Sequence, residues 1–350
     1  MTLRIDITGL APERLAFVPS PLAELAAMLH VLAAPEHHPR HAQWTTDMRA
    51  RLRPELTGRL GEADFLWRSS RAEFLVPARP RASLAAELDD VDRIDDEKYV
   101  TSALVTTCGS NRVYFGPSPL AVQARGAVQE AFAQRLVDDP GPTRARVRET
   151  LEQCGEAFFD AAWPSLAAQL AADVRVKKDL AERHGLGAAL ASASTALTLA
   201  PDGDCIVLDK LQDNATSAHD AGVTFIPTAF GHPHVVTVHT PGWQPVVQYP
   251  AAESGGAGEP ASLQAMELRL QALAHPVRLR LARTLVRSPQ TTGELAQAWS
   301  LTAPEVSRHL AVLRRAGLLT AQRQGRFVQH AVDPDVLSRL GNDLVSAIMR

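Results

Sequence analysis

Two capping boxes stand eleven residues apart near the end of this 350-residue chain, at Thr291-Thr292-Gly293-Glu294 and at Thr302-Ala303-Pro304-Glu305. In a capping box the hydroxyl and the carboxylate each satisfy a backbone N–H that the first helical turn leaves free, so a helix begins at each box. The first helix has room for only about two turns. Its apolar side holds Leu295, Ala296 and Trp299, and we expect Trp299 in the core. Two short helices joined by a tight turn are typical of a helix-turn-helix.

The second helix has two different faces. Val306, Leu310 and Leu313 recur at the spacing of a buried stripe, with His309 at its margin, where we expect packing rather than base contact. The opposite face carries Pro304, Ser307, Arg308, Ala311 and Arg315. Hydrogen-bond donors beside a small residue can approach the major groove closely and contact both base edges and phosphates. We therefore predict a recognition helix over residues 302–316, ended by Gly317 as a left-handed cap.

After this helix, residues 318–332 predict a two-stranded wing around Gln324-Gly325, with Arg323 and Arg326 beside its tip. Such a wing can reach the adjacent minor groove or the phosphate backbone. The expected DNA-binding residues are Thr302, Ala303, Pro304, Ser307, Arg308, Ala311, Arg315, Arg323, Gln324 and Arg326.

Two leucine-rich stripes flank this segment and exceed what a module of this size needs for its own core. One consists of Leu263, Met266, Leu270 and Leu273, and the other of Leu337, Leu340, Leu344 and Ile348. We expect the stripes to pair across the two-fold axis of a homodimer. Between them, Pro276 opens a further helix with Val277, Leu281 and Leu285 on one face.

Residues 251–262, AAESGGAGEPAS, contain no large apolar side chain and have the composition of a linker. The formal net charge of the whole chain is −3, and it is distributed very unevenly between the segments before and after this linker. Residues 263–350 hold twelve arginines and no lysine against six acidic residues, a net charge of +6, which leaves −9 on the remainder. A basic module on an acidic body indicates a polyanionic partner, and we expect double-stranded DNA. The domains are therefore expected at residues 1–250 and 263–350.

The stretches LQALAHPVRLRLARTL, TTGELAQAWSLTAPEVSRHLAVLRRAGLL and RQGRFVQHAV together resemble the winged helix-turn-helix of the arsenical-repressor (ArsR/SmtB) family of bacterial regulators. The resemblance covers about residues 263–345. It implies a homodimeric DNA-binding transcription regulator, usually a repressor. It also implies base or phosphate contacts from Thr302, Ala303, Ser307 and Arg308, and from Arg323 and Arg326 in the wing.

The first 250 residues predict a mixed domain, so the fold class is α+β and mainly helical. Helices are expected at residues 21–34, 119–137 and 143–192, the last broken near Trp163-Pro164, and the alternating segment LRIDIT predicts a strand. From Thr195 onward, short alternating runs predict a β-meander. The stretches SPLAELAAMLHVLAAPEHHPRHAQW and FIPTAFGHPHVVTVH resemble the accessory domain of unknown function that precedes such DNA-binding domains in actinobacterial regulators. For this domain we expect dimer contacts and a pocket for a small-molecule effector.

Metal-sensing members of the ArsR/SmtB family place cysteines on the helix before the recognition helix, or Asp and His on the last helix. This sequence has LAQAW at the first place, and no cysteine or histidine follows His330, so we assign no metal ligand there. Two other histidine groups occur, His30, His37, His38 and His41 in one and His219, His232, His234 and His239 in the other. His-Pro-rich connections are common at domain surfaces, and we expect structural or solvated roles. A metal-responsive sensor built on these histidines is the alternative.

Two further patterns are given structural interpretations. The cysteines Cys108, Cys154 and Cys205 are too far apart for a disulfide framework or a metal motif, and we expect them to be buried. The acidic run from Asp89 to Glu97 lacks the central Gly and the final Glu of an EF-hand loop, so we expect a solvated helix start or loop.

No Gly-rich phosphate loop, Gly-x-Ser-x-Gly elbow or His-Glu-x-x-His motif occurs, so we expect neither an enzyme nor a cofactor. The sequence shows no signal peptide and no run of about 18 apolar residues, which predicts a cytoplasmic protein without membrane contact. A winged-helix module that docks another protein is a second alternative to DNA binding.

Overall fold

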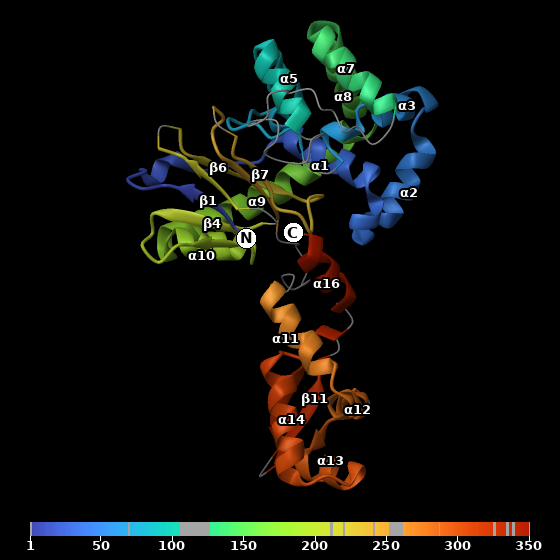
Figure 1. The fold of residues 1–350 in the computed structure, drawn as a ribbon, viewed down its shortest axis with the longest axis vertical. Coiled ribbons are helices and arrows are strands. Elements are labelled where there is room, and N and C mark those ends of the chain that lie inside the picture. The colour runs from blue at the N-terminus through green and yellow to red at the C-terminus, as the bar shows by residue number, and fades with distance from the viewer. Residues whose placement is uncertain are drawn as a thin grey trace. The chain divides into compact units, whose positions relative to one another are not determined.

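The computed structural model describes residues 2–68, 71–105, 127–210, 213–219, 221–240, 242–251, 262–286, 288–324, 327–333, 336–337 and 340–349. The chain divides into two compact units, Met1–Glu259 and Pro260–Met349, here called the N-terminal unit and the C-terminal unit (Figure 1). Among the described residues, no helix combines the length and the apolar character needed to cross a bilayer.

A buried helix organises the helical part of the N-terminal unit. Helix α1 (Pro21–Ala33) begins at Ser20, whose hydroxyl accepts the N–H of Ala23 at 3.0 Å, and its residues up to Leu32 are buried. A helix that is apolar on all sides belongs inside a protein. Its core is shared with α2 (Ala42–Arg51), α3 (Pro54–Glu62), α4 (Leu84–Asp92), α5 (Asp96–Val105), α7 (Ala127–Asp138) and α8 (Pro140–Cys154). Short 3-10 turns lie at Pro12–Arg14, Pro35–His37, Pro39–His41, Asp64–Leu66 and Glu73–Leu75.

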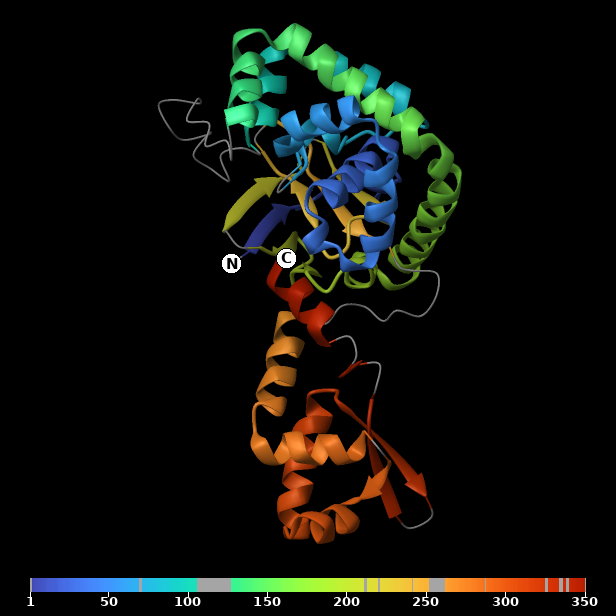
Figure 2. The same cartoon turned by 90° about the vertical axis from the view of Figure 1, so that its right-hand side faces the viewer.

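Helix α8 continues through a five-residue π-helical turn, Gly155–Phe159, into α9 (Asp160–His184), and Figure 2 shows the two helices as one long curved run. The prediction of a break near Trp163-Pro164 is wrong, because Pro164 lies inside α9. The irregularity comes one turn earlier. Proline has no N–H to donate and its ring crowds the carbonyl four residues earlier, here that of Asp160, which directly follows the π-turn. The helical path ends at Gly185, with φ of 82°, before α10 (Leu186–Ala193).

Apart from the position of the break, helices are therefore confirmed at residues 21–34 and through most of residues 143–192. The expected helix at 119–137 is present as α7 from Ala127, and residues 119–126 lie outside the described residues.

The strands of the N-terminal unit form two four-stranded sheets. The first has the order β3-β4-β1-β5, with β1 (Thr2–Asp6), β3 (Leu197–Leu199), β4 (Cys205–Asp209) and β5 (Asn214–Ser217). The second has the order β2-β6-β8-β7, with β2 (Leu15–Phe17), β6 (Val223–Thr228), β7 (Val236–Val238) and β8 (Val246–Pro250). The register places Ile5 opposite Ile206 in the first sheet and Phe17 opposite Phe225 in the second.

The α+β class is confirmed, but the expected β-meander is wrong. In a meander, consecutive strands pair antiparallel, whereas here β1 pairs in parallel with β5, and β6 pairs in parallel with both β2 and β8. The strands β1 and β2, from the start of the chain, each belong to one of the two sheets. Alternating apolar and polar residues after Thr195 show that strands form there but not which distant strands they pair with. The predicted strand LRIDIT is β1, and the expected turn at Pro201-Asp202-Gly203 joins β3 to β4.

The sheets share a second core with α9 and α10, which includes Leu3, Ile5, Val174, Leu190, Ile206 and Phe225. A charged pair is sealed beside this core. Lys177 is only 1% exposed; its Nζ donates to the carbonyl of Ser192 at 2.8 Å and lies 3.4 Å from the carboxylate of Asp173. Tyr249 donates its hydroxyl to the same carboxylate at 2.8 Å. Buried charges persist only with such partners, so this cluster is a structural tie between α9 and β8.

Cys154 and Cys205 are buried and unbridged, as the sequence predicts, and Cys108 lies outside the described residues.

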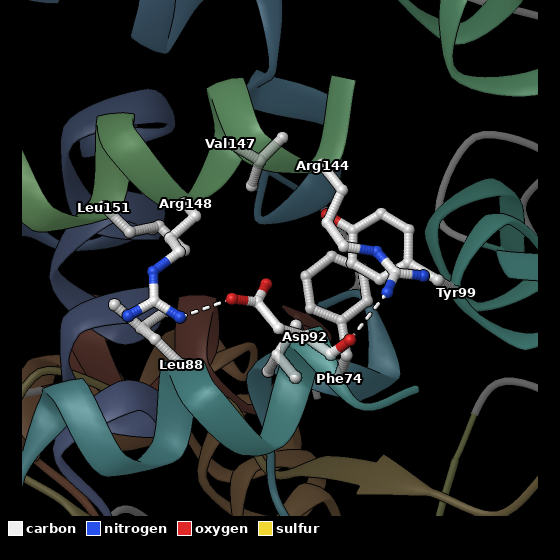
Figure 3. A pocket seen from close by; sticks show the side chains of 9 residues that line it. Phe74, Leu88, Asp92, Tyr99, Arg144, Val147, Arg148 and Leu151 are labelled. Carbon is white, nitrogen blue, oxygen red and sulfur yellow. Dashed lines mark hydrogen bonds and ion pairs between the residues drawn. The ribbon is translucent and has the colours of Figure 1, made fainter. Parts of the chain in front are cut away.

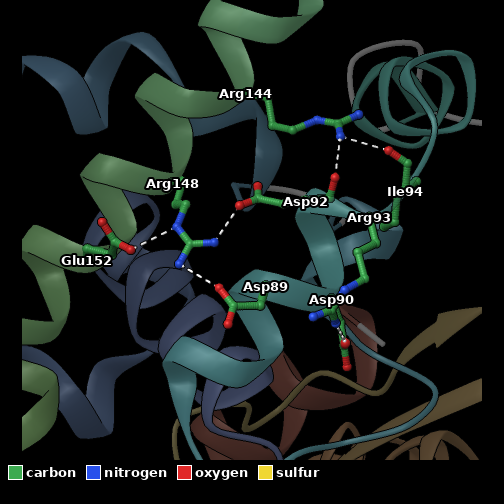
Figure 4. Close-up of polar contacts among 8 residues, drawn as sticks. All are labelled: Asp89, Asp90, Asp92, Arg93, Ile94, Arg144, Arg148 and Glu152. Carbon is green, nitrogen blue, oxygen red and sulfur yellow. Dashed lines mark hydrogen bonds and ion pairs between the residues drawn. The ribbon is translucent and has the colours of Figure 1, made fainter.

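The acidic run from Asp89 to Glu97 ends α4 and begins α5, and its carboxylates face arginines rather than solvent alone. Arg148 of α8 forms ion pairs with Asp89 at 2.8 Å, with Asp92, and with Glu152 at 2.8 Å (Figure 4). Arg144 donates to the carbonyl oxygens of Asp92 and Ile94 at 3.0 and 2.7 Å. The run therefore fastens α4 to α8, while Asp89, Asp92, Asp95, Asp96 and Glu97 stay exposed, so the expected solvated helix start is confirmed.

Apolar side chains lie beneath this network. Arg144 and Arg148 extend from one face of α8 toward Asp92, and Phe74, Leu88, Tyr99, Val147 and Leu151 line the small pocket between them (Figure 3). The guanidinium of Arg144 lies 4.4 Å from the ring centre of Tyr99. The stems of these arginines thus cover a hydrophobic seam while their charged ends reach the carboxylates.

The C-terminal unit consists of α11 (Leu263–Leu273), α12 (Pro276–Leu285), β9 (Gln290–Thr291), α13 (Thr292–Trp299), α14 (Ala303–Arg315), β10 (Leu319–Gln324), β11 (Phe327–Val332) and α16 (Leu340–Met349). Its sheet has the order β10-β11-β9. The core contains Leu281, Leu285, Leu295, Val306, Leu310, Leu313, Leu318 and Val332. These include Leu281 and Leu285 of the face predicted for α12 and the whole stripe predicted for α14, whereas Val277 is only partly buried.

The two leucine-rich stripes of this unit meet within one chain. Met266 of α11 packs with Leu340, Leu344 and Ala347 of α16, and Arg269 donates to Asp343 at 2.8 Å. Leu273 and Leu337 pack instead against the core of the unit. This part of the stripes is therefore satisfied without a second chain. The sequence pattern shows that a face is apolar but does not show which surface covers it.

Candidate DNA-binding surface

Both capping boxes form, and they fix the two helices of the helix-turn-helix. The carboxylate of Glu294 accepts the N–H of Thr291 at 2.7 Å, and the hydroxyl of Thr291 accepts the N–H of Glu294 at 3.3 Å. Thr302 and Glu305 repeat this exchange at 3.0 and 3.4 Å. Hydrogen bonds from Thr302 hold the pKa of the Glu305 carboxyl below its usual range, so the box is ionised and intact at neutral pH.

The turn between the helices depends on Ser300. This residue ends α13 in the left-handed conformation, with φ of 53°, and the N–H of Leu301 reaches back to the carbonyl of Ala296 at 3.0 Å. A side chain costs about 1–2 kcal/mol in this conformation, which glycine would avoid. No glycine or asparagine marks this turn in the sequence, so its geometry became visible only in the structure.

Helix α14 separates its two faces as the sequence predicts. Val306, Leu310 and Leu313 are buried against the core. The residues expected to face DNA are exposed, namely Thr302, Ala303, Pro304, Ser307, Arg308, Ala311 and Arg315. The helix ends at Gly317, which adopts φ of 68° and donates its N–H to the carbonyl of Arg314 at 2.9 Å, confirming the predicted left-handed cap.

The arginines of α14 form no ion pair within the described part of the chain, although Glu305 lies one turn before Arg308 on the same helix. No carboxylate there lies within 4.0 Å of the guanidinium groups of Arg308, Arg314 or Arg315. The N-terminal unit is different, since Arg59, Arg68, Arg144 and Arg148 are among its many ion-paired arginines. Positive charge on α14 is therefore left for a partner outside this unit.

Other arginines of the C-terminal unit are structural. Arg278 of α12 donates to the carbonyl oxygens of Ala272 and Gln271 at 2.6 and 2.9 Å, and so satisfies the free end of α11. Arg269 is held by Asp343. The basic composition alone does not distinguish these residues from those on the exposed face of α14.

The wing is a regular antiparallel hairpin, drawn as the two long arrows of the C-terminal unit in Figure 2. Its register runs from Leu319 opposite Val332 to Gln324 opposite Phe327, and Arg323 of β10 is exposed. Arg326 and the side chain of Gln324 lie outside the described residues. The structure therefore places one of the three predicted wing side chains, near the end of the hairpin.

Comparison with known protein families gives two matches along the chain. Residues 1–255 match a family of unknown function, DUF5937, and residues 273–322 match a helix-turn-helix domain. A biofilm growth-associated repressor of Agrobacterium fabrum is 36% identical over 85 residues, which make up 22% of this chain and 73% of that protein. The transcriptional regulator CmtR of Mycobacterium tuberculosis is 37% identical over 79 residues, 23% of this chain and 67% of that protein. The chain belongs to the DUF5937 family and to the ArsR/SmtB-type transcriptional regulators.

A solved structure of a possible transcriptional regulator for arsenical resistance is also similar, at 36% identity over 22% of this chain and 81% of that one, with a TM-score of 0.21. These relatives cover about a fifth of this ArsR/SmtB-type regulator, and its helix-turn-helix match at residues 273–322 lies in the C-terminal unit. The DUF5937 region has a family but no assigned activity.

One core assignment in this ArsR/SmtB-type regulator is wrong. Trp299 was expected in the core, yet it is 36% exposed and donates its indole N–H to the hydroxyl of Thr284 at 3.1 Å. Helix α13 spans only two turns, and Leu295 is its buried residue, with Ala296 packed beside it. At the edge of the core, Trp299 can donate its indole N–H to a hydrogen-bond acceptor, whereas a fully apolar core would offer none.

His309 behaves as the sequence predicts. It is half-buried on α14, and its ring centre lies 5.0 Å from that of His275. Burial and the nearby His275 and Arg278 lower its pKa, so the ring is neutral at pH 7. It packs between α12 and α14 and adds no charge to the exposed face.

Proposed function

We propose that this chain is a one-component repressor that binds an operator as a homodimer, with the exposed face of α14 in the major groove and the wing on the adjacent backbone or minor groove. The observation that carries the proposal is the combination on α14 of exposed donors, a small residue and guanidinium groups that form no ion pair among the described residues. Such a face has little to stabilise it within the unit and suits a polyanion.

The expected DNA contacts have different roles in this proposal. Arg308 and Ser307 lie near the start of α14 and read base edges, for which an arginine pairs with guanine through two parallel hydrogen bonds. Ala311 keeps the middle of the helix thin enough to enter the groove. Arg315 and the wing residue Arg323 bind phosphates, as Arg326 and Gln324 do at the tip. The hydroxyl of Thr302 is engaged in the capping box, so Thr302 and Ala303 act mainly by positioning the helix.

Apolar side chains left exposed on α11 and α16 support the homodimer. After these helices pack on each other, Leu263, Leu270, Val345 and Ile348 remain exposed, with Ile348 62% exposed. Burying them against the same face of a second chain gives a two-fold interface. Two recognition helices then meet half-sites about 34–36 Å apart, one turn of DNA.

We infer that the chain acts by binding rather than by catalysis, in the cytoplasm, where its DNA would be. Residues 251–262 serve as a linker between residues 1–250 and 263–350, and the DUF5937 region supplies dimer contacts or an effector site. An effector would act by favouring one spacing of the two recognition helices.

The experiment is to map the sites that the full chain occupies across the genome and to titrate a recovered site by fluorescence anisotropy at several salt concentrations. We expect affinity to fall linearly with salt on logarithmic axes. Mass measurement of the protein in solution tests the dimer independently. The absence of salt-dependent binding to every recovered site would overturn the proposal and favour a module that docks another protein.

A further inference from the structure

Three histidines from distant parts of the DUF5937 region meet inside the N-terminal unit. His30 lies on α1, His38 lies between two 3-10 turns, and His234 lies between β6 and β7. Their ring centres are 4.8 to 5.2 Å apart. One ring nitrogen from each lies within 4.8 Å of the others, and His30 and His38 are buried. The cluster shares no residue with the DNA-binding surface.

Backbone carbonyl groups fix the orientation of two of the rings. Nδ1 of His30 lies 2.8 Å from the carbonyl oxygen of Trp67, and Nδ1 of His38 lies 2.7 Å from that of His232. A carbonyl oxygen can only accept, so Nδ1 carries the proton in both rings. The lone pair is then on Nε2 of each. This arrangement, with one nitrogen donating to a carbonyl and the other free to bind, is usual for histidines that ligate a metal.

The Nε2 atom of His38 is buried and has no hydrogen-bond partner among the described residues. A buried polar atom without a partner carries a cost of about 1–3 kcal/mol, and such atoms in folded proteins call for an explanation.

We propose that His30, His38 and His234 bind a divalent transition-metal ion of the zinc type, with a water molecule or a fourth side chain completing the coordination. Zinc holds imidazole nitrogens at about 2.0–2.1 Å, which places them roughly 3.3 Å apart in a tetrahedron. The nitrogens, at most 4.8 Å apart here, close up by about 1.5 Å or less. Three nitrogen ligands favour zinc, cobalt, nickel or copper over magnesium or calcium.

The remaining histidines of this region differ in position. His37 is the nearest candidate for the fourth ligand, with its ring centre 5.7 Å from that of His234. His41 stacks on Phe230 at 4.3 Å, and His219 is exposed beside Asp6. The sequence contains eight histidines in two groups and does not show which of them lie together. The fold brings three of them, His30, His38 and His234, into one cluster.

An arginine and a carboxyl group lie beside the cluster. Arg71 is 5% exposed and close enough to lower the pKa values of His30 and His38. Its positive charge opposes a cation, but Glu24 faces it and accepts the N–H groups of Ala229 and Phe230, each at 3.1 Å. The alternative interpretation is that Arg71 and the histidines form a binding site for an anion, so inorganic phosphate is included in the test.

The test uses the full chain after chelation and dialysis, titrated with Co²⁺ as a coloured probe and then with Zn²⁺ in competition. We expect one Co²⁺ per chain, an absorption band typical of four-coordinate cobalt, and its displacement by Zn²⁺. His38→Ala and the half-buried His234→Ala are each expected to weaken binding by more than about tenfold, because even outer-shell partners of a ligand are worth 10–100-fold. His219→Ala is the matched control and should bind as the native chain does.

Thermal unfolding gives an independent readout. Zn²⁺ should raise the Tm of the native chain and of His219→Ala but not that of the two cluster variants, because only a folded site binds it. Circular dichroism establishes that the variants are folded before they are compared. The proposal is overturned by absent or non-saturable metal binding, by cluster variants that bind the metal as tightly as the native chain does, or by a Tm that rises with phosphate but not with Zn²⁺. None of these results bears on the DNA-binding proposal.

Discussion

Replacing Arg308 by alanine should separate DNA affinity from stability. Its guanidinium is exposed and has no carboxylate within 4.0 Å among the described residues, so removal breaks no ion pair and leaves no buried charge. An exposed substitution of this kind changes the free energy of unfolding by less than about 0.5 kcal/mol. A lost two-point contact with a base, by contrast, costs about 1–3 kcal/mol of discrimination, or roughly 5- to 150-fold in affinity.

The assay is fluorescence anisotropy with a mapped operator and with a scrambled duplex at matched salt, beside thermal unfolding of the same protein. The control is Arg175→Ala, which removes the same charge from an exposed position on α9 in the other unit. We expect Arg308→Ala to lose affinity for the operator much more than for the scrambled duplex, at unchanged Tm. If the loss is equal on both duplexes, Arg308 contacts phosphate rather than a base. Unchanged affinity for the operator at matched salt would refute the assignment altogether.

Four further predictions concern the C-terminal unit. Thr302→Ala should lower the free energy of unfolding by about 1 kcal/mol by removing an N-cap, measured by urea denaturation, and an effect below about 0.3 kcal/mol would contradict the observed box. The carboxyl of its partner Glu305 has a lowered pKa in the folded chain. Its contribution to the free energy of unfolding is therefore present above the unfolded pKa of about 4.3 and is lost as the pH falls through the lower folded pKa. Stability measured across acid pH should show this loss in the native chain and not in Thr302→Ala. Ser300→Gly should raise the free energy of unfolding by about 0.5 kcal/mol, because relief of the left-handed backbone exceeds the entropy cost of glycine, and a destabilised variant would show that the turn is not strained. Ile348→Glu should shift the protein toward monomer in sedimentation experiments without loss of helix content, and an unchanged mass would place the dimer contacts elsewhere.

The sequence by itself determined the features that arise from interactions over a few residues. The boxes at Thr291 and Thr302, the left-handed cap at Gly317 and the two faces of α14 each depend on atoms within one or two helical turns. Capping and amphipathic spacing are local, so the residue types that produce them can be identified in the chain without knowledge of its path.

Tertiary structure alone decided which distant surfaces meet. The parallel pairing of β1 with β5 joins residues about two hundred positions apart. The apolar stripes on α11 and α16 pack against each other within one chain. The meeting of His30 and His38 with His234 is of the same kind. Periodicity reports that a face is apolar or that a strand alternates, but each such face fits many partners equally well. The choice among them comes from the packing of the whole unit, in which all contacts must be satisfied together.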